Sequence, residues 1–300
     1  MTGRLTMRRD KEEFKKWISE EIKRFTREDP DNRLKLDGSF IFEEPLVGFV
    51  AGNDPIFYQL KEVIGDFHLT PYEAMSKIVE NREISVLEEE IGVVSYILPI
   101  SKKTREENAK MKSMPGERWA HTRLFGEHFN KKLQRHLVAF LGEEGYFAVA
   151  PQQAGELFET KRDDKVGYAS TWSQRHVAFA ADLGTFGLSD GLITKAGKAH
   201  RCGSVVVNQP LDSPQRREIN ETNIHWDCLY YQNEGCMQCV YRCPVGAISE
   251  ELGHDKDLCF EYAVKKSAEF VKENYKIDIY GCGLCQTDVP CEEESPFKEE

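Results

Sequence analysis

The chain has 300 residues, of which 40% are hydrophobic and 22 are glycine. This length and composition allow one large domain or two smaller ones with a packed core, and exclude a disordered chain or a miniprotein. There are 51 acidic and 40 basic residues, which leave a formal net charge of −11. A surface of that sign repels polyanions unless its basic side chains cluster, so non-specific binding to nucleic acid is not expected.

No segment has the uninterrupted run of about 18 apolar residues that a membrane-spanning helix needs. Arg8 and Arg9 stand near the start of the chain, but no apolar stretch follows them. The pattern is therefore that of neither a secretory nor a twin-arginine signal, and we expect a cytoplasmic protein.

The first half of the chain alternates between helical and strand-like patterns. Apolar residues recur at helical spacing over residues 14–25, which predicts an amphipathic helix. Residues 46–51 are expected to form a buried strand. Thr70 followed by Pro71 is typical of an N-cap and the first residue of a helix. The β-rich segment 91–100 predicts a central strand.

The alternation continues in the second half. Residues 118–141 predict a helix that ends at Gly142, and residues 146–150 predict a short strand. Residues 172–181 are expected to form a helix that leads into a glycine-rich turn, and residues 202–208 the strand beyond that turn. Helices and strands in this order predict the α/β (α+β) fold class.

The composition turns to Pro, Asp, Arg and Asn around residues 208–223, which marks a crossing on the surface. We therefore expect an α/β domain at residues 1–215 and a small ferredoxin-like domain at residues 216–300. Eight of the nine cysteines lie in the second part. In a reducing cytoplasm such a density of cysteine indicates a metal centre rather than disulfides.

The spacing of these cysteines indicates two iron–sulfur clusters. Residues 236–244 have the C-x2-C-x3-C-P ending of the bacterial ferredoxin run. In that run the last cysteine binds the other cluster of the pair, so a second set of cysteines is needed elsewhere in the chain. The crossover divides eight thiolates into two sets of four. Group 1 is Cys228, Cys236, Cys239 and Cys291, and group 2 is Cys243, Cys259, Cys282 and Cys285.

Two departures from the regular run affect this assignment. A regular run would have a cysteine where this chain has Asn233, so Cys228 takes that place in group 1. Five residues separate Cys285 from Cys291, where the run has three. Either departure is compatible with a cluster that lacks one cysteine ligand, and a pair of four-cysteine zinc sites is the alternative. Cys202, on an apolar strand, is expected to be a small buried side chain and not a ligand.

The glycine-rich segment of residues 181–194, followed by this order of cysteines, resembles a known family. It is similar to the segment that precedes the cluster-binding cysteines of cobalamin-dependent epoxyqueuosine reductases and reductive dehalogenases. Residues 279–286 (IYGCGLCQ) resemble the second cysteine motif of that family. The resemblance covers about residues 165–291, whereas residues 1–120 resemble the family only loosely.

The resemblance implies a corrin bound by the N-terminal part and two [4Fe-4S] clusters bound by the C-terminal part. Gly184, Gly187 and Gly191 would lie against the nucleotide tail of the cobalamin, where glycine lets the backbone approach closely. Electrons from a low-potential donor such as ferredoxin or flavodoxin would pass through the clusters to the cobalt.

The resemblance also implies a proton donor. Counting back without gaps from Gly184 puts Tyr168 where epoxyqueuosine reductases have an acidic residue, and reductive dehalogenases use a tyrosine as the acid. A tyrosine hydroxyl can give up a proton when a cation stabilises the phenolate, and Arg162, Lys165 and Arg175 are near in sequence. Simple packing of Tyr168 at a strand end is the alternative.

We therefore expect a cobalamin-dependent iron–sulfur reductase that acts on a small molecule or on another corrinoid protein. The chain ends nine residues after Cys291, without the helical-repeat tail that epoxyqueuosine reductases place beside tRNA. Its net charge also disfavours tRNA as a partner. Two alternatives remain open: an electron-transfer protein that binds no corrin, and a reductive activator of a separate corrinoid protein.

Overall fold

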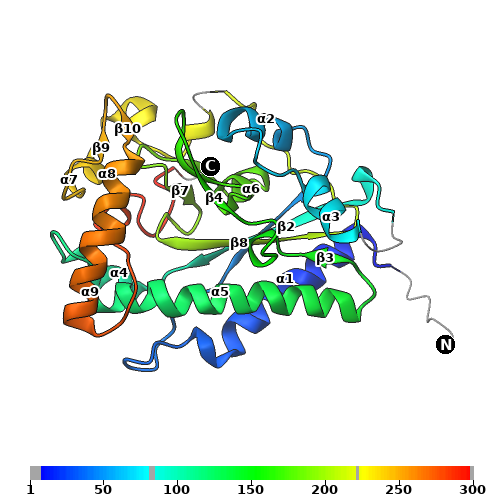
Figure 1. Ribbon diagram of the computed structural model, residues 1–300, viewed down its shortest axis with the longest axis horizontal. Coiled ribbons are helices and arrows are strands. Elements are labelled where there is room, and N and C mark those ends of the chain that lie inside the picture. The colour runs from blue at the N-terminus through cyan, green and yellow to red at the C-terminus, as the bar shows by residue number, and fades with distance from the viewer. Residues whose placement is uncertain (1–7, 81–84, 221–222, 298–300) are drawn as a thin grey trace.

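The computed structural model describes residues 8–80, 85–220 and 223–297. Its centre is a four-stranded antiparallel sheet in the order β1-β2-β8-β3. The strands are β1 (Leu46–Ala51), β2 (Gly92–Pro99), β3 (Ala148–Val149) and β8 (His200–Val207). Every residue of β2 is buried, as its central place requires. Helices cover both faces of this sheet (Figure 1).

One face packs against α1 (Lys11–Glu28) and α5 (Glu117–Glu143); in Figure 1 α1 passes obliquely behind α5. The Asp10 side chain caps α1 by accepting a hydrogen bond from the backbone N–H of Glu13. The apolar stripes of both helices meet alternate residues of β2 and β8 in one continuous core. Its members include Phe14, Ile18, Ile22, Phe129, Leu133, Leu137, Val94, Tyr96 and Val205.

The other face packs against α2 (Ile56–Ile64), α3 (Pro71–Val79) and α6 (Gln174–Ala180). Thr70 and Glu73 form a capping box at the start of α3, with Pro71 in its first turn. Trp172, just before α6, is fully buried, and its indole N–H donates to Ser204 Oγ at 3.0 Å. This bond fixes the start of α6 against β8.

Smaller elements surround the sheet. Residues 160–194 contain two antiparallel hairpins, and the cysteine-rich part gathers at one end of the sheet, where α9 lies beside the start of α5 (Figure 1). These elements are α4 (Lys102–Ala109), β4 (Thr160–Asp163), β5 (Gly167–Ser170), β6 (Gly184–Phe186), β7 (Leu192–Thr194), α7 (Gln238–Tyr241), β9 (Ile248–Ser249), β10 (Gly253–His254), α8 (Lys256–Phe260) and α9 (Ser267–Tyr275).

The expected helices and strands are present, with differences at their ends. The prediction that α5 ends at Gly142 is wrong, because the helix continues to Glu143 and the residue with positive φ is Gly145, at +85°. β1 is only half-buried. The mixed α/β class is confirmed. Because every pair of the central sheet is antiparallel, α+β is the closer description. Within the described ranges, no helix is both long and apolar enough to cross a membrane.

Gly203 in β8 tests how tightly the sheet packs. A Cβ at this position would come within 2.3 Å of the ring of Tyr96, which is fully buried and donates a hydrogen bond to Asn130. We expect Gly203→Ala to lower the free energy of unfolding in urea by about 1–3 kcal/mol, because the ring must move. Gly142→Ala is the matched control, since a Cβ there meets nothing within 4 Å. It should stabilise the helix by up to about 1 kcal/mol. Equal stability of the two variants would contradict this packing.

Candidate functional site

The structure brings the eight predicted cysteine ligands together in two sets. All four cysteines of group 1 line one small cavity. All four cysteines of group 2 line a separate cavity of about 220 Å³. The two sets are those that the ferredoxin crossover gives. None of the cysteines forms a disulfide. Within the described ranges, no three His, Cys, Asp or Glu side chains lie close enough together to hold one metal ion.

Group 1 is assembled from three distant segments. Cys228 follows the turn Asn223–His225, and its N–H donates to the carbonyl of His225 at 2.9 Å. Cys236 and Cys239 lie at the start of α7. Cys291 comes from the C-terminal segment, residues 287–293, and its carbonyl accepts a hydrogen bond from the backbone N–H of Lys198 at 2.9 Å. This last bond attaches the segment to the chain just before β8.

Group 2 depends on a glycine between two of its cysteines. Cys282 and Cys285 flank Gly283, which has a φ of +64°. A Cβ on Gly283 would come within 2.0 Å of the indole ring of Trp119 on α5. Only glycine therefore allows this loop to lie against α5. Cys259 lies in α8, and the Sγ of Cys243 accepts a hydrogen bond from a backbone N–H four residues later at 3.2 Å.

Burial and crowding disfavour the thiolate form of these cysteines. Burial raises the pKa of Cys239 and Cys259 to about 11 and that of Cys282 to about 12, and neighbouring cysteines add to the effect. For Cys282 these neighbours are the other three members of group 2. Four such thiols in one cavity can lose their protons together when a positive metal centre binds them.

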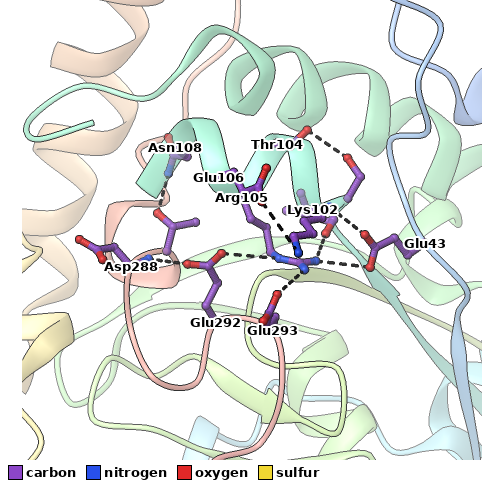
Figure 2. A network of polar contacts seen from close by, with 12 residues as sticks. Glu43, Lys102, Thr104, Arg105, Glu106, Asn108, Asp288, Glu292 and Glu293 are labelled. Atoms are coloured by element: carbon purple, nitrogen blue, oxygen red, sulfur yellow. Dashed lines mark hydrogen bonds and ion pairs between the residues drawn. The ribbon is translucent and has the colours of Figure 1, made fainter. Parts of the chain in front are cut away.

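Arg105 on α4 holds the C-terminal segment that carries Cys291 (Figure 2). Its side chain is 6% exposed, and its guanidinium lies 3.4 Å from Glu43, 3.6 Å from Glu292 and 3.1 Å from Glu293. Asn108, one turn further along α4, donates to Thr287 Oγ1 at 3.1 Å. Figure 2 shows these side chains converging between α4 and the segment.

A second buried arginine, Arg242, stands next to Cys243. Its guanidinium donates to the carbonyls of Leu284 and Thr287 and to the carbonyl of Met111, all within 3.2 Å. Leu284 lies in the second cysteine motif, Thr287 begins the C-terminal segment, and Met111 lies in the loop after α4. Arg242 therefore joins both cysteine motifs to the N-terminal part of the chain.

Three arginines bring positive charge to the group 2 cavity. Arg123, Arg175 and Arg201 line it together with apolar residues such as Trp119 and Ile248. Arg123 pairs with Glu127 at 3.5 Å and donates to the hydroxyl of Tyr280. Burial, with Arg123 nearby, lowers the pKa of Arg201 to about 10. The cavity can therefore accept a negatively charged group beside the cysteines.

Tyr168 lies on β5. Its ring stacks on that of Phe260, the last residue of α8, with centroids 4.4 Å apart. The cations expected around it are differently placed. Arg162 faces Tyr168 across the β4–β5 hairpin but pairs with Asp257 at 2.8 Å. Arg175 lines the group 2 cavity, of which Tyr168 is not a lining residue.

The three predicted glycines lie on the β6–β7 hairpin and do not gather at one cavity. Gly184 lines a cavity of about 450 Å³, Gly187 the group 1 cavity and Gly191 the group 2 cavity. A Cβ on Gly184 would come within 2.1 Å of the carbonyl oxygen of Ile193 on the partner strand. The hairpin itself therefore requires this glycine. Asp182 has a φ of +56°, which aspartate tolerates better than most residues.

Several residues of the site were not predicted from the sequence. The main ones are Lys198, Arg105 and Arg242, all of which are buried. Arg242 offered a signal, since it is a charged residue directly before a cysteine of the ferredoxin run. The positions of Lys198 and Arg105 depend on contacts with residues about 90 and 190 positions away, for which the local sequence holds no pattern. Cys202, predicted to be no ligand, lies half-buried on β8 and lines neither cysteine cavity.

Comparison with known proteins finds relatives of one kind. No protein-family profile matches the chain. An epoxyqueuosine reductase of Bacillus cereus is 28% identical over 123 residues, which cover 39% of this chain and 29% of that relative. The match thus spans less than a third of the relative's length.

Solved structures with a similar arrangement include two kinds of reductase. An epoxyqueuosine reductase with an epoxyqueuosine-modified tRNA-Tyr stem loop has a TM-score of 0.48 at 15% identity, over 94% of this chain and 67% of that chain. A reductive dehalogenase, whose structure suggests a mechanism for B12-dependent dehalogenation, has a TM-score of 0.49 at 14% identity, over 83% and 30%. Because both scores are below 0.5, relatedness rests on the sequence match.

These are the proteins that the glycine and cysteine motifs resemble, and the resemblance stated from the sequence is confirmed by the match to epoxyqueuosine reductase. The expectation that tRNA is disfavoured as a partner finds no support. A net charge of −11 does not by itself exclude a polyanion, because basic side chains can cluster on an acidic protein.

The Arg105 contacts predict which substitution frees the C-terminal segment. Arg105→Ala leaves Glu292, which is 17% exposed, without its cation, and we expect the free energy of unfolding to fall by about 2–4 kcal/mol. Proteolysis within residues 287–293 should become faster. Lys102→Ala on the same helix is the control, because Lys102 is 68% exposed and lies 3.9 Å from Glu106. Its effect should stay within about 0.5 kcal/mol. Equal losses in the two variants would show that Arg105 does not hold the segment.

Proposed function

We propose that the protein is an iron–sulfur reductase that binds one [4Fe-4S] cluster at each cysteine group and a corrin beside them. The observation that carries this proposal is the division of eight cysteines between two cavities, four to each. Four thiolates are the donor set that a cubane cluster takes. The buried and crowded thiols fit a metal centre that replaces their protons.

The sequence match favours a reductase over a simple electron carrier, because the relative that it finds is an enzyme. In this proposal residues 1–215 bind the corrin and the substrate, and residues 216–300 bind the clusters. A low-potential donor such as ferredoxin or flavodoxin would supply the electrons. The two remaining roles, a carrier without corrin and an activator of another corrinoid protein, share the clusters and differ in whether a corrin binds.

The space next to Gly184 is compatible with a corrin. Two neighbouring cavities, of about 450 and 650 Å³, share Asp182, Leu183 and Lys195 along their common border. The charged side chains among them, Asp182 and Lys195, suit the amides and the phosphate of a cobalamin. When bound, a corrin supplies a cobalt centre that takes up electrons and passes them to a substrate.

For the proton we propose Tyr168. Its register with the acidic position of the family supports this role, and its ring stacks on Phe260, the residue that follows Cys259 in the chain. The pairing of Arg162 with Asp257 leaves less positive charge for a phenolate than the sequence suggests. In this proposal the residues of this chain would hold the proton at the Tyr168 hydroxyl, and the arginines that line the group 2 cavity would attract an acidic substrate group towards the cluster.

The substrate that we propose is a small molecule with an acidic group. The group 2 cavity, with Arg123, Arg175 and Arg201 on an otherwise largely apolar wall, supports this class. An epoxyqueuosine-containing tRNA is the second candidate, favoured by the identity of the sequence relative. An assay of turnover with each of the two candidate substrates distinguishes between them.

The cluster proposal predicts the metal content. After anaerobic reconstitution we expect about eight iron and eight acid-labile sulfide per chain, because each cubane holds four of each. Cys239→Ser should remove one cluster, whereas Cys202→Ser should leave the iron content unchanged. About two zinc per chain with negligible iron would replace the cluster proposal with structural zinc sites.

The corrin and the proton donor are tested together. Hydroxocobalamin added to the reconstituted protein should bind with a spectral shift that shows displacement of its dimethylbenzimidazole base. Turnover is then measured with a reduced viologen and either an epoxyqueuosine-modified stem loop or a brominated hydroxybenzoate. Tyr168→Phe should bind the corrin normally but lose about 10²- to 10⁴-fold in turnover, as for a removed proton donor.

Two results would contradict these assignments. If no corrinoid produces heat of binding or a spectral change, the electron-carrier role takes the place of the reductase. If Tyr168→Phe turns over at the unaltered rate, or loses its cofactors, then Tyr168 serves packing against Phe260.

A further inference from the structure

Lys198 is a buried cation at the edge of the group 1 cavity. It lies between the β6–β7 hairpin and β8, and the residue is 4% exposed. Its Nζ donates a hydrogen bond to Ser189 Oγ at 2.8 Å. Its stem passes the hairpin at Gly191, where a Cβ would come within 3.1 Å of Cε. The ammonium is therefore fixed by a hydroxyl and by packing.

No carboxylate in the described part of the chain pairs with this ammonium. The closest candidates along the chain are engaged elsewhere. Asp190 lies 3.4 Å from His254 and 3.8 Å from Lys256, and Glu292 lies 3.6 Å from Arg105. An unpaired ammonium inside a protein costs several kcal/mol unless a negative charge lies near it.

The groups that can supply this negative charge are cysteines. Lys198 lines the group 1 cavity together with all four cysteines of that group, and its backbone N–H donates to the carbonyl of Cys291 at 2.9 Å. A cluster held there by four thiolates would carry the negative charge that the buried ammonium lacks.

We infer that Lys198 is a positioning residue that raises the reduction potential of the cluster at group 1. This inference rests on the proposed function. A fixed positive charge stabilises the reduced form of a neighbouring redox centre, because that form carries one more negative charge. Net charge and hydrogen bonds around the sulfurs are the means by which proteins set cluster potentials. Lys198 lines the group 1 cavity and is not among the residues that line the group 2 cavity.

The test is a redox titration of the reconstituted protein, followed by electron paramagnetic resonance. In Lys198→Met, which keeps the length of the side chain and removes its charge, we expect the midpoint potential of one cluster to fall by at least about 59 mV. This corresponds to a tenfold change in a one-electron equilibrium constant. The signal that disappears in Cys236→Ser identifies this cluster as the one at group 1. The second cluster should shift less.

Three further variants separate charge from structure. Lys198→Arg keeps the charge and should keep the potential. Ser189→Ala removes the acceptor of the ammonium but not the charge, and should shift the potential by less than Lys198→Met. Lys102→Met removes an equal charge from a position on α4 that is 68% exposed, where solvent screens it, and should have little effect. Lys198→Gln repeats the test if the methionine variant takes up no iron.

The outcomes distinguish this inference from the function beneath it. Full iron content with an unchanged potential in Lys198→Met would overturn the role of Lys198 and leave the clusters in place. A shift of the same size in Lys102→Met would also overturn it, because any lost positive charge would then have the same effect. Absence of iron from the unaltered protein would overturn the cluster proposal and this inference together.

Discussion

Compensation of charge is the constraint on which this structure depends. Eight cysteines are drawn into two cavities where burial raises the pKa of most of their thiols, so the chain alone does not stabilise them as thiolates. The positive groups that line these cavities, Lys198 at group 1 and Arg123, Arg175 and Arg201 at group 2, are fewer than the eight thiolates would be. A cluster of iron at each cavity would complete the balance, since its charge replaces the protons of four thiols at once.

The scaffold explains how such a site is kept in register. Cys291 is far in sequence from the other members of group 1, and it reaches them because the C-terminal segment folds back onto the chain before β8. Arg105 and Arg242 hold this segment and the neighbouring cysteine loop to α4 through buried ionic and carbonyl contacts. The central sheet matters to the site mainly as the support for α4, α5 and the β6–β7 hairpin.

Features set by local chemistry could be predicted from the sequence. The stripe of α1, the cap at Thr70 and the buried strand β2 depend on nearby residues and agree with the structure. Features set by distant contacts could not. Gly184 was attributed to a cofactor, but the carbonyl of Ile193 already requires it, and α5 passes Gly142 because the left-handed turn falls at Gly145. Lys198 carries no local pattern, and only the fold brings it to the cysteines.

The distribution of charge also shows why net charge is a poor guide to the substrate. The chain has a formal charge of −11, yet the cavities that hold the cysteines are lined by arginine and lysine and by no acidic residue. Acidic side chains on the surface govern long-range repulsion, which salt screens within about 10 Å. The arginines of the group 2 cavity would act at contact distance on a group bound there, where salt screens their charge much less. Recognition of an acidic substrate is therefore compatible with a strongly acidic protein, provided that the substrate is small enough to enter the cavity or presents a single group to it.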